Sequence, residues 1–140
     1  MVAKFQIGPN PNCRSPSKEP ATIIAGPDGS LWFVETARDT LPNCPDLGNR
    51  IGHVTLAGEV TEYHIPTPDG IPAGLVAGPD GNIWFTEYTG NRIGCLTPTG
   101  TMAEYPVPTT DSRPDGITVG PDGAIWFTEF LGNKIGRLAL

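Results

Sequence analysis

The sequence has no long hydrophobic run and few basic residues, and each absence argues against a class of protein. No apolar stretch approaches the roughly 20 residues that a membrane-spanning helix needs. Nine Lys and Arg residues stand against fifteen Asp and Glu, for a net charge of −6, whereas a nucleic-acid-binding surface needs clustered basic side chains that neutralise phosphates. We therefore expect neither nucleic acid nor a membrane surface as a partner.

Uninterrupted windows for a helix are equally scarce. The 140 residues include 18 Gly and 16 Pro, which place a helix breaker at about every fourth position. Between the breakers lie short runs rich in β-branched and aromatic residues, such as NIWFTEY and EYHIPT, which favour strands. The sequence therefore predicts an all-β fold rather than a disordered Pro/Gly tract.

A GPDG motif followed by an aromatic run occurs three times. The copies begin at Gly26, Gly78 and Gly120, at intervals of 52 and 42 residues. The ten extra residues of the first interval all lie between Trp32 and Gly48, so the underlying repeat is 42 residues long. This length is typical of a four-stranded β-propeller blade. A single blade cannot bury both of its faces, so the blades must pack against one another around an axis.

The second copy shows the expected strands of a blade in full. Strands a to d are predicted at AGLVAG, NIWFTEY, RIGCLTP and TMAEYPVP, with turns rich in Pro, Asp, Gly and Asn between them. The third copy ends after its strand c, in GNKIGRLAL, and has no strand d of its own. However, VAKFQI at residues 2–7 aligns without gaps on VTEYHI at residues 60–65, the strand d of the first copy. The predicted order over residues 1–140 is therefore d, abcd, abcd, abc, with residues 2–7 completing the last blade.

Three blades are too few to close a ring. An open arc would leave two apolar blade faces in water. Two chains would form a closed six-bladed ring of C2 symmetry if the N-terminal strand of each chain completed the last blade of the other. The alternative interpretation is that the sequence is a fragment of a longer propeller. We expect a homo-oligomer, in the form of such a dimer.

The repeated motifs resemble those of one known family. GPDG-x-[IL]-W-F-[TV]-E, GN-[RK]-IG and G-x-[VM]-x-E-Y-x-[IV]-P, together with RPDGIT at residues 113–118, are similar to the virginiamycin B lyase (streptogramin lyase) family of β-propellers. Full-length members look like single-chain seven-bladed rings. The resemblance implies an elimination that opens the ester bond of a cyclic depsipeptide, the type B streptogramins. It also implies a general base, a Mg²⁺ ion and carboxylates at the mouth of the ring.

The chain departs from the family where its catalytic histidines would stand. In the family these histidines lie at the start of strand a in the context P-H-[AG]-I, and the matching positions here hold Ala21, Ala73 and Asp115. The two histidines of this chain, His53 and His64, fall on strands c and d, where we expect packing or surface roles. An elimination needs a base at the acidic C–H. Asp115 is the candidate, and its carboxylate would need a raised pKa to act as one.

Each aromatic run ends in a glutamate, and this residue has two interpretations. As a site, Glu35, Glu87 and Glu129 would place six carboxylates around the mouth of a dimeric ring, with Arg113 and Asp115 beside them as further ligand-binding candidates. Glu87 and Glu129 are then also the candidate Mg²⁺ ligands. As structure, a residue that recurs in every blade is part of the blade, paired with the basic residue of the following GN-[RK]-IG. The second interpretation is the more usual for a repeated residue.

The cysteines mark two insertions in the first blade. Cys13 and Cys44 each lie in one insertion, and both loops should emerge on the same face, which predicts a Cys13–Cys44 disulfide beside the mouth. The alternative is two free thiols in a reducing cytosol. The compartment follows from this choice, extracytoplasmic with the disulfide and cytoplasmic without it. The start MVAKFQIGPNPNCR lacks the apolar core of a signal peptide. Cys95, on strand c, is expected to be a buried thiol.

Two classes of function remain. The first is a ligand-binding or scaffold module, a rigid propeller whose loops recognise a small molecule, peptide or glycan and which needs no cofactor. The second is a lyase-like enzyme with Mg²⁺ at the ring mouth. The lack of histidine at positions 21, 73 and 115 favours the first class. The sequence has no phosphate-binding glycine loop, nucleophile elbow or zinc pattern, which argues against those enzyme classes.

Overall fold

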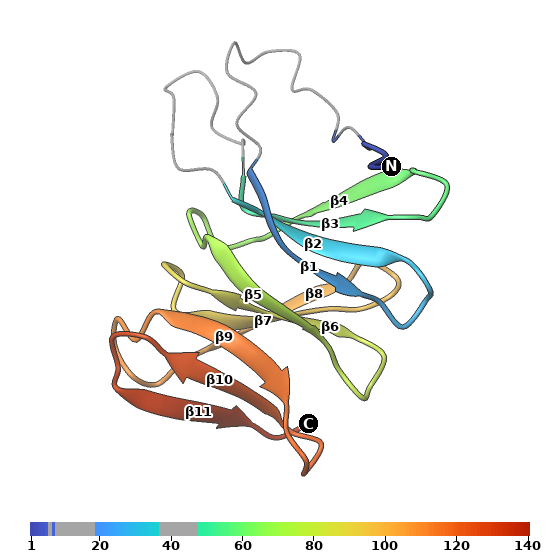
Figure 1. Ribbon diagram of the computed structural model, residues 1–140. Helices are drawn as coiled ribbons and strands as arrows, with labels where there is room; N and C mark the ends of the chain where they lie inside the picture. Colours follow the sequence, from blue (N-terminus) through green and yellow to red (C-terminus); the bar gives the residue numbers. More distant parts are fainter. Residues whose placement is uncertain (6, 8–18, 37–47) are drawn as a thin grey trace, which may run out of the picture.

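The computed structural model describes residues 1–5, 7, 19–36 and 48–140 of the chain. Within these residues eleven strands form three antiparallel sheets that stack side by side, and none of these residues forms a helix (Figure 1). The prediction of an all-β fold built from propeller blades is confirmed. The same residues contain no helix that is long and apolar enough to cross a membrane.

Each sheet is one blade, and its strands pair in chain order. The first blade contains β1 (Glu19–Ala25), β2 (Leu31–Thr36), β3 (Arg50–Val54) and β4 (Val60–His64). The second contains β5 (Pro72–Ala77), β6 (Ile83–Glu87), β7 (Arg92–Leu96) and β8 (Met102–Pro106). The third contains β9 (Pro114–Val119), β10 (Ile125–Glu129) and β11 (Lys134–Leu138). In the described part of the chain the third sheet therefore has three strands where the other two have four.

The GPDG motif closes the turn between the first two strands of a blade and anchors the tryptophan that follows. In the second blade the Asp80 carboxylate accepts hydrogen bonds from the Asn82 backbone N–H at 3.1 Å and from the Trp84 indole N–H at 3.2 Å. Gly81 has a φ of 80°, which glycine adopts without steric cost. A Cβ on Gly78 would lie 2.6 Å from the indole ring, so glycine is required for this packing. The motif recurs because it forms a turn and seats a side chain.

The GN-[RK]-IG motif joins one blade to the next. Asn91 has a φ of 55°, and its side-chain amide donates to the carbonyl oxygens of Val107 at 3.3 Å and Thr109 at 2.9 Å. Its side-chain oxygen accepts from the backbone N–H of Ser112 at 3.0 Å. Asn49 makes the same kind of bonds one blade earlier. The asparagine thus ties the turn after the second strand of a blade to the loop that leads into the next blade.

Two hydrophobic clusters lie between the blades. Between the first and second blades the buried members are Trp32, Val34, Ile51, Ile65, Leu75, Ile83, Phe85 and Leu96. Between the second and third they are Trp84, Ile93, Cys95, Val107, Ile125 and Phe127. Trp32 and Trp84 are each 4% exposed, as expected for tryptophans that pack between blades.

Every blade has two faces, which we name by their neighbours. The rear face packs against the following blade and carries Trp32 and Ile51 in the first blade, whereas the front face packs against the preceding one. In Figure 1 the blades follow one another from the first at the top to the third at the bottom. No described blade packs on the front face of the first blade or on the rear face of the third.

Candidate functional site

The candidate site lies on the mouth side of the blades, which we define as the side where β1, β5 and β9 start and β2, β6 and β10 end. This side is at the left in Figure 1. The three positions that correspond to the family histidines, Ala21, Ala73 and Asp115, lie near the starts of these strands. Asp115 is half-buried. The candidate base therefore lies on the mouth side, in the first strand of its blade.

Hydrogen bonds between blades fix the backbone at these positions. The Thr86 hydroxyl, fully buried in β6, donates to the carbonyl oxygen of Asp115 at 2.7 Å and accepts from the backbone N–H of Gly74 at 2.8 Å. At the first interface the Thr22 hydroxyl donates to the carbonyl oxygen of Ala73 at 2.9 Å. The pairing of each blade's first strand with its second also has an irregular register beside Ala21, Ala73 or Asp115, which is typical of a β-bulge. These hydrogen bonds therefore join the strand starts of neighbouring blades on the mouth side.

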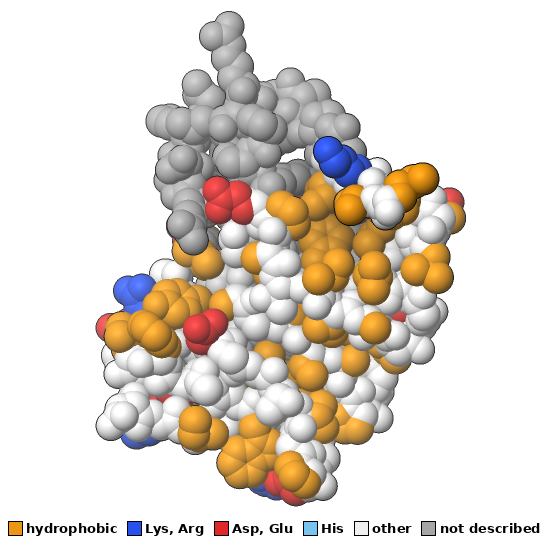
Figure 2. Space-filling view, in the orientation of Figure 1, with side chains coloured by type: hydrophobic (Ala, Val, Ile, Leu, Met, Phe, Trp, Pro, Cys, Tyr) orange, Lys and Arg blue, Asp and Glu red, His pale blue; other side chains and the backbone are white. Residues whose placement is uncertain are grey.

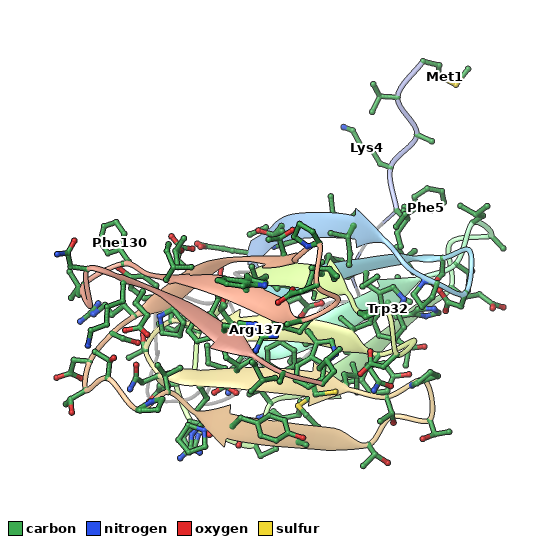
Figure 3. All side chains as sticks on the ribbon, turned by 90° about the horizontal axis from the view of Figure 1, so that it is seen from below. Met1, Lys4, Phe5, Trp32, Phe130 and Arg137 are labelled. Atoms are coloured by element: carbon green, nitrogen blue, oxygen red, sulfur yellow. The ribbon has the colours of Figure 1, made fainter. Side chains whose placement is uncertain are left out.

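A cation and two aromatic rings meet on the mouth side of the second and third blades. The guanidinium carbon of Arg113 lies 5.2 Å from the centroid of the Tyr88 ring, within cation–π range. The Tyr88 and Phe130 rings are 6.1 Å apart, and Phe130 is 64% exposed. Figure 3 shows the Phe130 ring projecting from the loop between β10 and β11. We call Arg113, Tyr88 and Phe130 the mouth cluster.

The mouth cluster forms part of an exposed apolar area. Leu131, which follows Phe130 in the same loop, is also exposed. In Figure 2 hydrophobic side chains gather beside a basic group at the left edge of the described surface. An exposed aromatic ring beside a cation and a half-buried ring can offer stacking and hydrogen bonding to one ligand, so this surface has the chemistry of a binding site.

The backbone is strained where the loops enter the mouth. Arg113 has a φ of 51° and precedes Pro114, although left-handed backbone is uncommon for residues other than glycine. Ile71, which precedes Pro72 one blade earlier, has a φ of 50°, which is rarer still for a β-branched residue. The carbonyl oxygen of Arg113 accepts a hydrogen bond from the Phe130 backbone N–H at 3.1 Å. Strained residues that the surrounding structure holds in place are concentrated at functional sites.

The repeated glutamates lie beneath the mouth rather than on it. Glu35, Glu87 and Glu129 are all buried. The Glu87 side chain packs under its own turn, so that a Cβ on Gly90 would lie 2.5 Å from its Oε2 atom and a Cβ on Gly70 would lie 2.7 Å from it. The buried glutamate explains why glycine occupies both positions.

Burial and a neighbouring acid keep Glu87 protonated. Burial, and then the nearby Glu104 carboxylate, raise the pKa of Glu87 to about 8, although Arg92 opposes the shift. Glu104 itself accepts hydrogen bonds from the backbone N–H and the hydroxyl of Thr67, both at 3.0 Å. Burial disfavours the charged form of a carboxyl group, and a second carboxylate nearby disfavours it further. At neutral pH Glu87 is therefore a neutral acid inside the blade.

These properties do not fit the Mg²⁺ ion that the family resemblance implies. Mg²⁺ takes ionised, exposed oxygen ligands that face a common point. Glu87 and Glu129 belong to different blades, both are buried, and Glu87 is protonated at neutral pH. Within residues 1–5, 7, 19–36 and 48–140, no three His, Cys, Asp or Glu side chains form a group that could hold a metal.

The histidines lie away from the positions at the strand starts. His53 lies near the GPDG turn at the opposite side of the first blade, where its Nε2 atom is 2.9 Å from the Asp28 carboxylate and its ring is 4.5 Å from that of Trp32. His64 is exposed at the end of the outer strand β4. Hydrogen bonds from Ser30 and His53 hold the pKa of Asp28 well below its ordinary value, and they outweigh the opposing effect of burial. His53 therefore has a packing role.

The cysteine predictions have separate outcomes. The predicted Cys13–Cys44 disulfide lies outside the described residues and stays a prediction. Cys95 is a buried free thiol, as expected, and burial raises its pKa to about 11.

Sequence reasoning named Arg113 and missed both aromatic residues of the mouth cluster. Their positions were recognisable, because each comes directly after the repeated glutamate, where the three copies carry Thr36, Tyr88 and Phe130. In a repeat, the identical positions build the blade. Positions that differ between copies, next to a motif on the mouth side, are the better candidates for binding.

Comparison with known proteins identifies the family. The chain matches the virginiamycin B lyase family over residues 9–140. Virginiamycin B lyase from Staphylococcus aureus is 40% identical in its crystal structure, with a TM-score of 0.78, and the match covers 90% of this chain and 40% of that chain. A catalytically inactive histidine-to-alanine variant of the same enzyme, crystallised with quinupristin, matches with the same identity, coverage and TM-score.

Two other matches are shorter or share only the fold. The virginiamycin B lyase of Saccharopolyspora erythraea is 54% identical over 28 residues, which are 20% of this chain and 9% of that protein. Hydrazine synthase from Kuenenia stuttgartiensis, at 15% identity and a TM-score of 0.69, shares the fold alone. The chain spans 40% of the length of the S. aureus enzyme. With its three blades and its repeated motifs, this chain belongs to the virginiamycin B lyase family of β-propellers.

Proposed function

We propose that this chain is a ligand-binding propeller of the family, which holds a cyclic depsipeptide of the streptogramin B type on its mouth side without opening it. The observation that carries the proposal is the mouth cluster, in which Arg113 lies over the Tyr88 ring and Phe130 is exposed beside it. Such a ligand has backbone carbonyl oxygens that can accept hydrogen bonds from a guanidinium group. Apolar or aromatic groups of the ligand can pack on the two rings.

The hydrogen bonds between the strand starts support binding on the mouth side. The hydrogen bonds from Thr86 to Asp115 and from Thr22 to Ala73 hold the strand starts in place without a ligand. A preorganised site pays less conformational entropy when it binds. The inactive variant of the S. aureus enzyme was crystallised with quinupristin, so in that protein the loss of a histidine is compatible with a bound ligand.

The proposal includes no chemical step, because the positions at the strand starts do not provide a histidine. Ring opening by elimination needs a base positioned at the acidic C–H. Ala21 and Ala73 carry no titratable group, and Asp115 is a carboxyl group where the family has imidazole. The buried glutamates beneath the mouth are not within reach of a ligand on its surface.

Titration with quinupristin tests the proposal. We expect saturable binding by isothermal titration calorimetry, with the same affinity in Mg²⁺ and in EDTA. Chromatography with mass spectrometry should recover the ligand unchanged after prolonged incubation. A ring-opened isomer of equal mass would contradict a pure binding function, and no binding at high micromolar ligand would contradict the proposed ligand.

Variants of the mouth cluster locate the site. Arg113→Ala and Phe130→Ala should each weaken binding about tenfold, because each removes one well-placed contact to the ligand. Leu56→Ala is the matched control, since Leu56 is an exposed apolar residue in the turn after β3, on the side opposite the mouth. Equal losses in all three variants would contradict binding at the mouth.

A further inference from the structure

We infer that the rear face of the third blade binds the front face of the first blade in a second copy of this chain, and that the N-terminal segment of that copy supplies the fourth strand. The two internal interfaces show what covers such faces, because they join the same motifs within one chain. This inference concerns assembly and is independent of the ligand at the mouth.

Equivalent isoleucines show that the rear face of the third blade carries the kind of surface that a following blade covers elsewhere in the chain. Ile51 in β3 and Ile93 in β7 are 0% and 1% exposed, because a following blade covers each of them. Ile135 occupies the same position in β11 and is 65% exposed. An isoleucine in this position is therefore an interface residue that lacks its cover within the described chain.

The front face of the first blade has the complementary property. Leu75 in β5 is 4% exposed, because it packs on the preceding blade, whereas its equivalent Ile23 in β1 is 57% exposed. Around Ile23 lies an apolar hollow lined by Phe5, Ile7, Pro20, Ala21, Ile23, Leu31, Phe33, Val54 and Val60. In the internal interfaces this front-face surface is filled by the preceding blade.

The N-terminal segment already has half of the contacts of a fourth strand. Tyr63 in β4 packs against Gly100 in the next blade, and a Cβ on that glycine would lie 3.1 Å from its ring. Phe5, which the alignment of residues 2–7 on 60–65 makes equivalent to Tyr63, packs in the same way against Gly58, where a Cβ would lie 2.7 Å from its ring. Phe5 therefore contacts the first blade as the fourth strand of a preceding blade would.

The second contact of a fourth strand, the stacking of its aromatic ring on the tryptophan of its own blade, is missing both for Phe5 and for the third blade. The Tyr63 ring also stacks on Trp32 of its own blade at 5.9 Å, and Tyr105 stacks on Trp84 at 5.8 Å. Within the described chain Trp126 has no such ring from a fourth strand, and Phe5 has no tryptophan. Phe5 of one copy would complete the stack on Trp126 of the other.

A hydroxyl group gives a second, polar match. Thr86 donates to the carbonyl oxygen of Asp115 in the next blade. Its equivalent Thr128 accepts a hydrogen bond from the backbone N–H of Gly116 at 2.9 Å, as Thr86 does from Gly74, but it is exposed. The carbonyl group that corresponds to Asp115 is that of Ala21, which lines the hollow on the first blade.

Arg137, a charged residue in the middle of the rear face, is already paired with an acidic side chain of its own blade. Arg137 occupies the position of His53 and Cys95, donates to the Asp122 carboxylate at 2.8 Å and lies 5.8 Å over the Trp126 ring. A charge that is paired before association costs less to bury than an isolated one. Arg137 is therefore compatible with a covered face.

The geometry of the contact limits the number of copies. A rear face that binds a front face is a head-to-tail contact, which forms either a closed ring or an open filament. Two copies of residues 1–140 give six blades, within the four to eight of known propellers, whereas three copies would give nine. We therefore assign the partner as one second copy, with two identical contacts between the chains.

Complementation between two variants tests this assignment. Ile135→Glu places a charge on the rear face and Ile23→Glu places one on the front face, so each substitution should prevent its face from binding a second copy. Each variant alone should therefore be a monomer of about 14.8 kDa by sedimentation. The unmodified chain should sediment as a dimer of twice that mass. An equimolar mixture of the two variants should again form dimers, because one of the two contacts combines an intact rear face with an intact front face. The rescue also shows that both variants are folded.

Two further variants control the test. Leu131→Glu changes an exposed apolar residue whose equivalent Thr89 is exposed even between two blades, so it should leave the dimer intact. Thr128→Val, which copies the Val34 of the first blade, should raise the dimer dissociation constant about three- to tenfold. A monomeric unmodified chain at micromolar concentration, filaments, a dimeric single variant, a mixture that fails to associate, or an unchanged dissociation constant for Thr128→Val would each overturn the assignment.

Discussion

The second and third blades contain the same five residues, IWFTE, in β6 and in β10, and differ in what surrounds them. In β6 all five residues are buried, whereas in β10 Trp126 is half-buried and Thr128 is exposed. The other three residues of β10 are buried in the same way as in β6, because they lie on the front face against the second blade. The comparison shows that a residue in a repeat takes its burial from the neighbouring blade rather than from its own strand.

The largest effect that we predict comes from deleting residues 1–7. The deletion removes the Phe5 and Ile7 side chains, which lie on the hollow of the first blade, and with them the proposed fourth strand of the third blade. If the third blade is completed by a partner, the deleted chain should lose its dimer entirely, with a loss of several kcal/mol from apolar burial alone. Sedimentation at micromolar concentration measures this. A truncated chain that still dimerises would show that the third blade does not depend on the segment.

The second-largest effect comes from the equivalent tryptophans Trp84 and Trp126, which test the comparison between the two blades. Trp84→Ala should lower the free energy of unfolding by about 3–5 kcal/mol, because Trp84 is buried between two blades. Trp126→Ala should lower the free energy of unfolding much less than Trp84→Ala when the protein is diluted to the monomer. In the dimer the two variants should lower it by nearly the same amount. Denaturant unfolding at two protein concentrations separates these cases. Equal losses at every concentration would contradict a partner on the rear face.

The asparagines of the GN-[RK]-IG motif form a second pair of variants, with smaller expected losses of stability. Asn91→Ala should lower the free energy of unfolding by about 2 kcal/mol, because it leaves the backbone groups of Val107, Thr109 and Ser112 without their bonds to the side chain. Asn133→Ala, at the equivalent exposed position of the third blade, should have a small effect in the monomer. Chemical denaturation of the two variants side by side tests the difference, and similar losses in the monomer would contradict it.

The smallest effect concerns pH and belongs to the second blade. The folded pKa of Glu87 is about 8, above the ordinary 4.5, so between these pH values the folded chain holds a proton that the unfolded chain has lost. The contribution of Glu87 to stability is complete below about pH 4.5 and decreases by up to about 1.4 kcal/mol per pH unit towards pH 8. Glu87→Gln keeps the shape without the titration, so it should flatten this dependence.

Unfolding free energies at pH 5 and pH 8 measure that slope. Glu59→Gln controls for the loss of one carboxylate, because Glu59 is exposed on a turn. The hypothesis would be wrong if the slope of Glu87→Gln were the same as that of the unmodified chain.

Much of the fold was predictable because its determinants are local. The Asp80 side chain bonds to groups two and four residues away, and Gly81 forms the turn itself, so GPDG predicts the same turn wherever it occurs. The 42-residue period and the strand order within a blade follow from the spacing of such turns. The alignment of residues 2–7 on residues 60–65 predicts that the N-terminal segment supplies a fourth strand to the last blade, and this stays a prediction.

The mouth was predictable only in part, because it is assembled from residues that are distant in the sequence. Arg113 and Asp115 were expected there and lie on that side. The glutamates were named as mouth candidates because they end the second strands, but whether such a side chain faces solvent or lies under its turn depends on Gly70 and Gly90, which close over it. Tyr88 and Phe130 come together from two blades, a contact that no single repeat contains.

The sequence by itself determined the turns, the strands and the membership of each residue in a front or a rear face, because these depend on hydrogen bonds and alternation within one blade. Only the tertiary structure decided which of these residues are buried, which carboxyl group has a raised pKa and which residues meet on the mouth side. The reason is that burial and electrostatics depend on the neighbouring blade, and the same IWFTE has a neighbour on both faces in β6 and on one face in β10.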